Sequence, residues 1–538
     1  MSKQSKKPSF IGGAAILAAA VAVVKLIGAV YKIPLNNILG DLGKTYFQTA
    51  YEIYNVLLTV STAGLPLAIS RLTSEAHARG LENEKRKIFR TAIWLFLALG
   101  LAGSALMGFG SAQLASFQNN PMAALPIWAL SPAVFCVCLL ACMRGYTQGQ
   151  GNMAPTAISQ ILEALCKLGL GLPLAWYALH IGLGLDYAAA GAIFGVTLGT
   201  VLSMLFLIVY LFIHRDRTKA LDVPSSSGTL MRKILAIGIP ITLSNSAMSI
   251  ITMIDTKIIL GRLQTGLGLT ETAAAALKGQ YSYAMDMLNM VSSFVFPVTM
   301  SLIPFAAAAL ARRDYEDANR TVSNGFRLIA AMAIPAGVGL SVLATPIMRL
   351  MLPYQPEGAV AAGPHLRVLG IACIFVCLMT LTNVILQTYG KELIPICTVI
   401  TGGVVKITLN YVLVGTPEIN IHGAPISTLC CYAVIVGLNL FFVWKYSPKK
   451  PRYVQIFMKP ILASALMGAA AWAAYGFADR ALAGGHSAYG ANAIATLLGI
   501  CAGVAVYFVL VVALQILRAE DLRAMPHGKK LADILHLK

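Results

Sequence analysis

Two lysines inside the first long apolar stretch of the chain are its clearest candidates for chemistry. Lys25 and Lys32 stand seven residues apart, which places them two turns apart on one helix face, and no acidic residue lies within one turn of Lys25. A charge near the middle of a bilayer costs at least ~3 kcal/mol, so it should face a cavity or a partner. The pair therefore predicts an anion opposite it, either Glu52 or a bound phosphate.

Another lysine position occurs twice in the chain, with different surroundings. Glu163 and Lys167 are four residues apart, in the order that favours an ion pair along a helix. Lys406 corresponds to Lys167 in an internal repeat, but Gly402 stands where the acid would be. Lys167 can therefore be neutralised within its own helix, whereas Lys406 needs a partner from another helix or from a substrate.

Charged residues at comparable depth in other apolar stretches complete the candidate set. We expect them to line a central cavity formed mainly by the first two helices of each half of the chain. The alternative is an internal network of salt bridges that fixes the helix bundle. The predicted lining residues are Lys25, Lys32, Glu52, Lys167, Asp255, Lys257, Asp286 and Lys406.

The apolar stretches that hold these residues are about as long as a bilayer is thick. A helix crosses the hydrocarbon core in roughly 20 residues. Fourteen stretches of that order predict an all-α polytopic membrane protein with 14 transmembrane helices. The stretches cover residues 10–31, 46–70, 88–110, 123–143, 154–179, 187–213, 234–260, 282–310, 326–352, 365–389, 393–415, 423–446, 456–478 and 491–517.

Composition and charge distribution agree with a membrane location. The chain is 57% hydrophobic and 12% charged, which excludes an ordinary soluble protein. Of its 41 Lys and Arg residues, 30 fall in alternate gaps between the stretches and four in the opposite gaps. This positive-inside pattern predicts that both termini are cytoplasmic. It also accounts for the net charge of +19 without nucleic acid as a partner.

The chain contains a weak internal repeat with an offset near 235 residues. Three pairs of segments match in the same order: 51–55 with 285–289, 64–68 with 302–306, and 148–167 with 387–406. Because the repeat spans six helices, the two halves share one orientation, as in alternating-access transporters. We predict a six-helix bundle at 1–222, a second at 223–447, and two further helices with a cytoplasmic tail at 448–538.

The sequence offers no residue set for catalysis. All eight histidines lie in loops or at the edges of stretches, and an enzyme needs an acid–base or nucleophile constellation. The ten cysteines lie inside stretches without a neighbouring His or carboxylate, so we predict neither a metal site nor a disulfide. We expect a transporter without a catalytic residue or cofactor. A membrane-embedded transferase and a non-transporting scaffold for wall or spore-coat machinery are the alternatives from other classes.

Two segments carry a family resemblance. The run from Arg144 to Gln160, followed by Glu163, resembles the junction between the fourth and fifth helices of SpoVB/YtgP-type proteins. Gly64-Leu65-Pro66 through Arg71 is similar to the end of their second helix. The motif residues are Gly64, Pro66, Arg71, Gln148, Gly151, Pro155, Gln160 and Glu163. These proteins belong with MurJ to the multidrug/oligosaccharidyl-lipid/polysaccharide (MOP) exporter superfamily, and the resemblance covers essentially the whole chain.

The resemblance implies a MATE/MurJ-like fold of two six-helix repeats plus two C-terminal helices. It also implies a flippase in the bacterial cytoplasmic membrane that moves an undecaprenyl-pyrophosphate-linked saccharide by alternating access. The cargo would be lipid II or a related cell-wall, spore-cortex or polysaccharide precursor. Membrane lipid, the lipid-linked oligosaccharide and the cell-wall synthesis machinery would be its partners.

Two departures from the family pattern bear on mechanism. MurJ-like proteins tend to carry arginines in the first helix, whereas this chain carries Lys25 and Lys32, which are point charges rather than bidentate forks. Some members bind Na⁺ in the C-terminal half, and here Asp255 and Asn410 are possible oxygen donors. A coupling ion, Na⁺ or H⁺, is thus the only small-ion partner that we expect. The alternative transport function is a MATE-type multidrug or cation antiporter.

Overall fold

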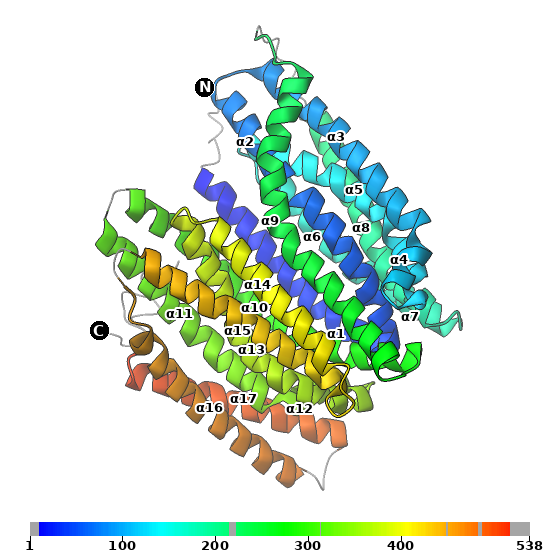
Figure 1. Cartoon of the computed structure of the whole chain (residues 1–538), viewed down its shortest axis with the longest axis vertical. Helices are drawn as coiled ribbons and strands as arrows, with labels where there is room; N and C mark the ends of the chain where they lie inside the picture. Colours follow the sequence, from blue (N-terminus) through cyan, green and yellow to red (C-terminus); the bar gives the residue numbers. More distant parts are fainter. Residues whose placement is uncertain (1–9, 215–221, 312–313, 448–449, 483–486, 517–538) are drawn as a thin grey trace, which may run out of the picture. The chain divides into compact units, whose positions relative to one another are not determined.

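The structure, a computed structural model, describes residues 10–214, 222–311, 314–447, 450–482 and 487–516. Every regular element in these ranges is a helix (Figure 1). The predicted all-α membrane fold is confirmed. The predicted cytoplasmic tail and the extreme termini lie outside the described residues, so their orientation stays a prediction.

Eleven helices in the described residues are long and apolar enough to cross a membrane, or up to 12 if one bent pair, Ser227–Leu243 with Ser246–Gly266, forms one span. Helix α1 (Phe10–Thr62) contains most of the first two predicted stretches, joined across a kink at Gly40 where φ is 63°. Its 53 residues correspond to about 80 Å of helix, which is enough for two crossings. Helix α10 (Glu271–Ala311) is not among the eleven. The count of 14 therefore stays a prediction.

The first compact unit consists of Met1–Gln264 and Leu269–Gly279. Helix α5 lies at its centre and packs against α1, α2, α3 and α8. Helix α9 packs against α1, α2 and α3 and therefore belongs to this unit. After α1, the helices of the first unit are α2 (Leu65–Ala78), α3 (Glu82–Phe109), α4 (Ser111–Phe117), η1 (Pro121–Ala123), α5 (Ala124–Gly149), α6 (Ala154–Cys166), η2 (Lys167–Gly171), α7 (Leu172–His180), α8 (Leu185–Ile213) and α9 (Ser227–Gly261).

The second compact unit consists of Thr265–Gly268 and Gln280–Lys538. Helix α13 packs against α11, α12 and α15, while α16 and α17 pair with each other. The elements that follow α9 are η3 (Arg262–Gly266), α10, α11 (Tyr315–Val342), α12 (Ala344–Met351), α13 (Pro356–Thr388), α14 (Leu393–Leu413), η4 (Asn420–His422), α15 (Gly423–Tyr446), α16 (Tyr453–Leu482) and α17 (Ala488–Ala513). The predicted three-part division at 222 and 447 stays a prediction.

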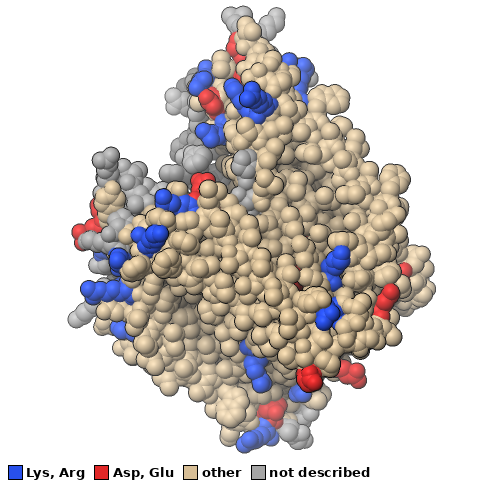
Figure 2. Space-filling model, in the orientation of Figure 1, with Lys and Arg blue, Asp and Glu red and all other residues tan. Residues whose placement is uncertain are grey.

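Large apolar side chains cover much of the outer surface of the helices. Phe109, Phe212 and Phe477 are 91%, 75% and 78% exposed. Figure 2 shows broad areas without charged side chains on the face in view. A water-soluble protein rarely exposes such continuous apolar surface, whereas lipid solvates it without cost.

Small residues let the helices of the first unit approach one another closely. A Cβ atom added to Gly64, at the start of α2, would overlap with the carbonyl oxygen of Gly238 in α9. A Cβ atom added to Gly145 in α5 would lie 2.7 Å from the carbonyl oxygen of Pro66. Helix association in lipid depends on such close packing, because lipid provides no hydrophobic force between helices. Gly64 and Pro66 of the motif therefore hold α2 between α5 and α9.

We expect Gly64→Ala to destabilise the protein by about 1–3 kcal/mol, since the added methyl group must push α2 and α9 apart. The measurement is thermal unfolding of the purified protein in detergent. Gly28→Ala is the matched control, because a Cβ atom there meets nothing within 4 Å. An equal effect of the two substitutions would contradict the packing explanation.

Candidate functional site

A buried group of charged side chains, here called the Glu52 cluster, lies within the first unit. It consists of Glu52 with Gln48 from α1, Asp255 with Thr256 from α9, and Lys278 from the first turns of α10. The side chains of Glu52, Asp255 and Lys278 are only 4%, 2% and 4% exposed. Three ionisable groups are thus held away from bulk solvent in one place.

The cluster is electrostatically mixed. The Glu52 carboxylate is attracted by Lys278 and repelled by Asp255. The side-chain amide of Gln48 donates a hydrogen bond to Glu52 Oε1 at 3.1 Å. The cluster therefore brings charges of both signs together at a place that bulk solvent hardly reaches.

Neutral hydrogen bonds fix the helices around the cluster. The Thr45 hydroxyl donates to the carbonyl oxygen of Ala275 at 2.7 Å, which ties α1 to the start of α10. The Asn120 side chain donates to the Thr49 hydroxyl at 3.0 Å. Both bonds hold the turns of α1 that precede Glu52, so its position is set by tertiary contacts.

Lys167 is held between two aromatic rings. Its Nζ atom lies 4.8 Å from the ring centre of Tyr31 and 4.7 Å from that of Tyr51. The predicted pairing of Lys167 with Glu163 is wrong, because Glu163 accepts an ion-pair hydrogen bond from Arg144 at 3.2 Å. The guanidinium of Arg144 reaches this carboxylate from α5, and a π-helical turn begins at Lys167 itself. Cation–π contacts therefore replace the expected salt bridge.

Lys25 and Lys32 lie on the first part of α1. The side chain of Lys25 is exposed, next to exposed Leu26, and that of Lys32 is half-buried. Glu52, which we considered as their acidic partner, interacts with Lys278. A diphosphate remains the other anion that the two lysines predict, and their role in lining a cavity stays a prediction.

The other predicted lining residues are distributed over both units. Lys257 belongs to the first unit, where its Nζ atom lies 3.4 Å from the ring centre of Phe117. Asp286 and Lys406 belong to the second unit, and both side chains are buried. Each unit therefore carries buried charge of its own.

The proposed Na⁺ donors are not neighbours within either unit. Asp255 belongs to the first unit and Asn410 to the second, where Asn410 accepts a hydrogen bond from Ser427 at 2.5 Å. Over the described ranges, no group of three His, Cys, Asp or Glu side chains is arranged to hold a metal ion. A Na⁺ site stays a prediction.

The motif residues build the junction between α5 and α6. The Gln148 side chain donates to the Thr156 hydroxyl at 3.3 Å, and Gly151 ends the turn with a φ of 80°. Pro155 stands in the first turn of α6, and Arg144 donates to Ser159 at 2.9 Å as well as to Glu163. In the described structure these residues position two helices. Gln160 is half-buried on α6, and Arg71 is exposed on α2.

Sequence reasoning missed Lys44 and Lys278. Both belong to the four basic residues that stand in the gaps opposite to the positive-inside side. Their side chains are nevertheless only 1% and 4% exposed. Glu52 itself is the sequence feature that points to such a residue. An acid within an apolar stretch needs a cation from elsewhere in the chain. Nothing in the local sequence identifies Lys278 as that cation.

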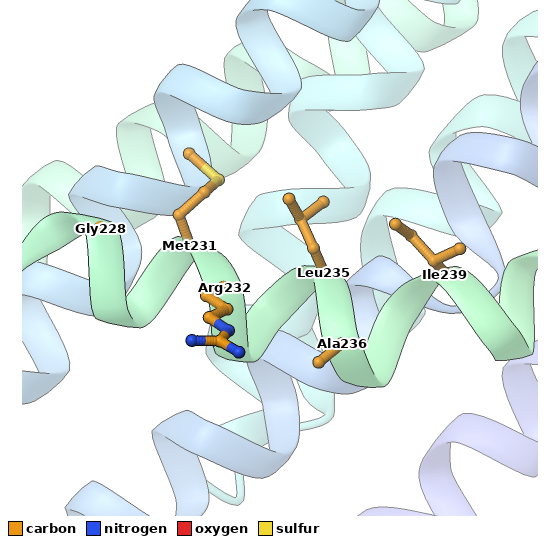
Figure 3. Close-up of a pocket in the computed structure, with 6 residues that line it drawn as sticks. All are labelled: Gly228, Met231, Arg232, Leu235, Ala236 and Ile239. Carbon is orange, nitrogen blue, oxygen red and sulfur yellow. The ribbon is translucent and has the colours of Figure 1, made fainter.

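A separate hollow of about 600 Å³ lies along the first half of α9 (Figure 3). One face of the helix lines it, and Arg232 is the charged side chain among the lining residues. The lining residues are Gly228, Met231, Arg232, Leu235, Ala236 and Ile239. The predicted cavity residues are not among them.

Comparisons with known proteins place the chain among membrane transport proteins. Residues 10–309 match the family described as "Polysaccharide biosynthesis protein", and residues 240–412 match the MatE family. The chain is 27% identical over 530 residues to the uncharacterized membrane protein YabM of Bacillus subtilis (strain 168), covering 97% of this chain and 96% of that protein. It is 24% identical to stage V sporulation protein B of the same organism, covering 97% and 98%. Lipid II flippase MurJ of that organism is 24% identical, covering 75% and 77%.

Solved structures share the fold. A structure of lipid II flippase MurJ in an inward closed conformation superposes with a TM-score of 0.68 at 14% identity, covering 93% of this chain and 99% of that one. An inward-facing MATE family multidrug transporter of the MOP superfamily gives a TM-score of 0.62 at 16% identity, covering 80% and 98%. The MATE/MurJ-like architecture predicted from sequence is confirmed.

We expect Lys278→Met to destabilise the protein by about 3–5 kcal/mol, because it leaves the buried Glu52 carboxylate without the cation that attracts it. Glu52→Gln should cost less, since a neutral amide of similar shape then replaces the buried charge. The double variant should cost less than the sum of the single changes. Thermal unfolding in detergent measures all three variants.

Arg79→Ala is the control for these single and double substitutions. The Arg79–Glu75 ion pair is 2.8 Å long, but its side chains are 67% and 51% exposed. Its loss should cost at most about 1 kcal/mol. Strictly additive effects of the Glu52 and Lys278 substitutions would show that the two side chains do not act as a unit.

Proposed function

We propose a function from one premise: the chain belongs to the polysaccharide biosynthesis protein family and, through it, to the MOP exporter superfamily. One relative, MurJ of Bacillus subtilis, is a lipid II flippase, and the chain is itself a multi-span membrane protein. The finer proposal is that it moves an undecaprenyl-pyrophosphate-linked saccharide from the cytoplasmic to the outer leaflet of the bacterial cytoplasmic membrane. Both termini would face the cytoplasm.

The observation that carries the proposal is the extent of the family match. It runs over residues 10–309 and so contains Lys25, Lys32, Glu52 and Lys278. A diphosphate headgroup bearing a sugar is anionic and strongly hydrated, whereas its prenyl tail is soluble in lipid. Exposed and half-buried lysines on a membrane helix can neutralise such a headgroup while the tail stays in the bilayer.

The driving force in this proposal is electrical and ionic. An inside-negative potential favours outward movement of an anionic headgroup, by about 2.3 kcal/mol per charge for each 100 mV. The buried acid Glu52 would be the place where a coupling ion, H⁺ or Na⁺, is exchanged during the cycle. Alternating access to the two sides of the membrane would couple these steps.

The names of the relatives suggest which saccharides the chain would carry. Stage V sporulation protein B and lipid II flippase MurJ both align with this chain, so lipid II and a spore-cortex or polysaccharide precursor are the candidate cargoes. The enzymes that make and consume these lipid-linked saccharides would be its functional partners.

A second candidate function is export of multidrug or cationic compounds. The match of residues 240–412 to the MatE family favours it, as do the buried acids Glu52 and Asp255. Efflux of ethidium from cells that express the chain tests this candidate. Efflux above that of vector-only cells, abolished by Asp255→Asn, would support it against the flippase proposal.

We expect the wild-type chain to restore growth of a bacterial strain depleted of its lipid II flippase. Lys25→Ala and Lys32→Ala should each reduce the rescue, because a diphosphate then loses a countercharge. Growth and accumulated lipid II are the measurements, at matched protein levels in the membrane.

Lys450→Ala is the control, since its ammonium lies over the Trp444 ring, 3.8 Å from the ring centre, outside the predicted spans. It should rescue like the wild type. If the wild-type chain does not restore growth, lipid II is not its cargo. Full rescue by both lysine variants would instead contradict only the cavity assignment.

A further inference from the structure

Two histidines meet in the second unit, at a place that the transport proposal does not use. His365 comes from the first third of α13, and His422 stands at the end of η4, directly before α15. Their ring centres are 4.8 Å apart, with the ring planes inclined by 38°. Tyr281 of α10 closes the other side, edge-on to His365 at 6.3 Å.

The two imidazoles differ in their access to solvent. His365 is only 1% exposed, and its Nδ1 atom has no hydrogen-bond partner among the described residues. His422 is exposed. A buried polar nitrogen without a partner costs about 1–3 kcal/mol, so such an atom in a folded protein calls for a ligand.

The neighbouring hydroxyl groups do not supply that ligand. The Tyr281 hydroxyl is within 2.9 Å of the Thr428 hydroxyl, and the two satisfy each other. The tyrosine ring therefore serves as a wall of the site. The Nδ1 atom of His365 is thus left without a partner beside the His422 ring.

The spacing of the rings suits a shared metal ion. Neutral imidazole is the commonest protein ligand for transition metals. Two imidazoles bound to one ion at ~2.0–2.1 Å, with a tetrahedral angle between them, place their ring centres roughly 5 Å apart. The observed 4.8 Å matches that separation.

We propose that His365 and His422 bind a divalent transition-metal ion of the Zn²⁺ or Cu²⁺ class. Only two side chains would hold the ion, and the exposed His422 ring would give it a route to solvent. The site is therefore exchangeable, unlike a closed structural zinc site with four protein ligands. The predicted topology places it at the outer ends of α13 and α15. A bound ion would join these two helices within the second unit, and this inference does not depend on the transported cargo.

Zn²⁺ titration of the purified full-length chain tests the proposal. The protein carries no polyhistidine tag and is treated with a chelator before isothermal titration and thermal unfolding in detergent. We expect saturable binding at one site and a rise in unfolding temperature with Zn²⁺. His422→Gln changes an exposed position and should weaken Zn²⁺ binding at least roughly tenfold. Loss of a residue that only supports a metal ligand already lowers metal affinity about 10–100-fold.

His214→Gln is the matched control. His214 is also exposed and stacked on an aromatic ring, that of Tyr210 at 4.2 Å, but it has no ring contact with a second histidine among the described residues. It should bind Zn²⁺ like the wild type. Absence of saturable binding, or equal affinity in His422→Gln, would overturn the proposal.

Discussion

The energetic cost of charge inside an apolar environment is the constraint on which this structure depends. Glu52, Asp255 and Lys278 are buried together in the first unit, where Lys278 attracts the Glu52 carboxylate and Asp255 repels it. The attraction can offset the loss of hydration only where the surrounding helices hold the charged groups in fixed positions. The hydrogen bond from Thr45 to the Ala275 carbonyl supplies part of that rigidity.

Close helix packing is what makes such fixed positions possible. Glycines at 64 and 145 bring α2 against α9 and α5 without intervening side chains. The motif at the α5–α6 junction adds the Arg144–Glu163 pair and the left-handed turn at Gly151. The residues that mark the family in sequence thus serve mainly to define the helix framework, and the charged groups are placed by that framework.

The same physics connects the structure to transport. A headgroup crossing a membrane must exchange water for protein contacts, and a carrier must provide charges that are already positioned. Lys25 is exposed and Lys32 half-buried on α1, whereas Lys167 is held between Tyr31 and Tyr51. The proposed function assigns the anionic headgroup to the first two lysines and leaves Lys167 a structural charge fixed by aromatic rings.

The sequence by itself determined the membrane environment, the helical class and the family, because apolar length, charge asymmetry and local motifs are properties of neighbouring residues. It also identified Glu52 as an acid in need of a partner. Only the tertiary structure decided that Lys278 interacts with Glu52, that Arg144 takes Glu163 from Lys167, and that His365 meets His422. Each of these contacts joins residues from different helices, and its geometry depends on how the helices pack, which the local sequence does not encode.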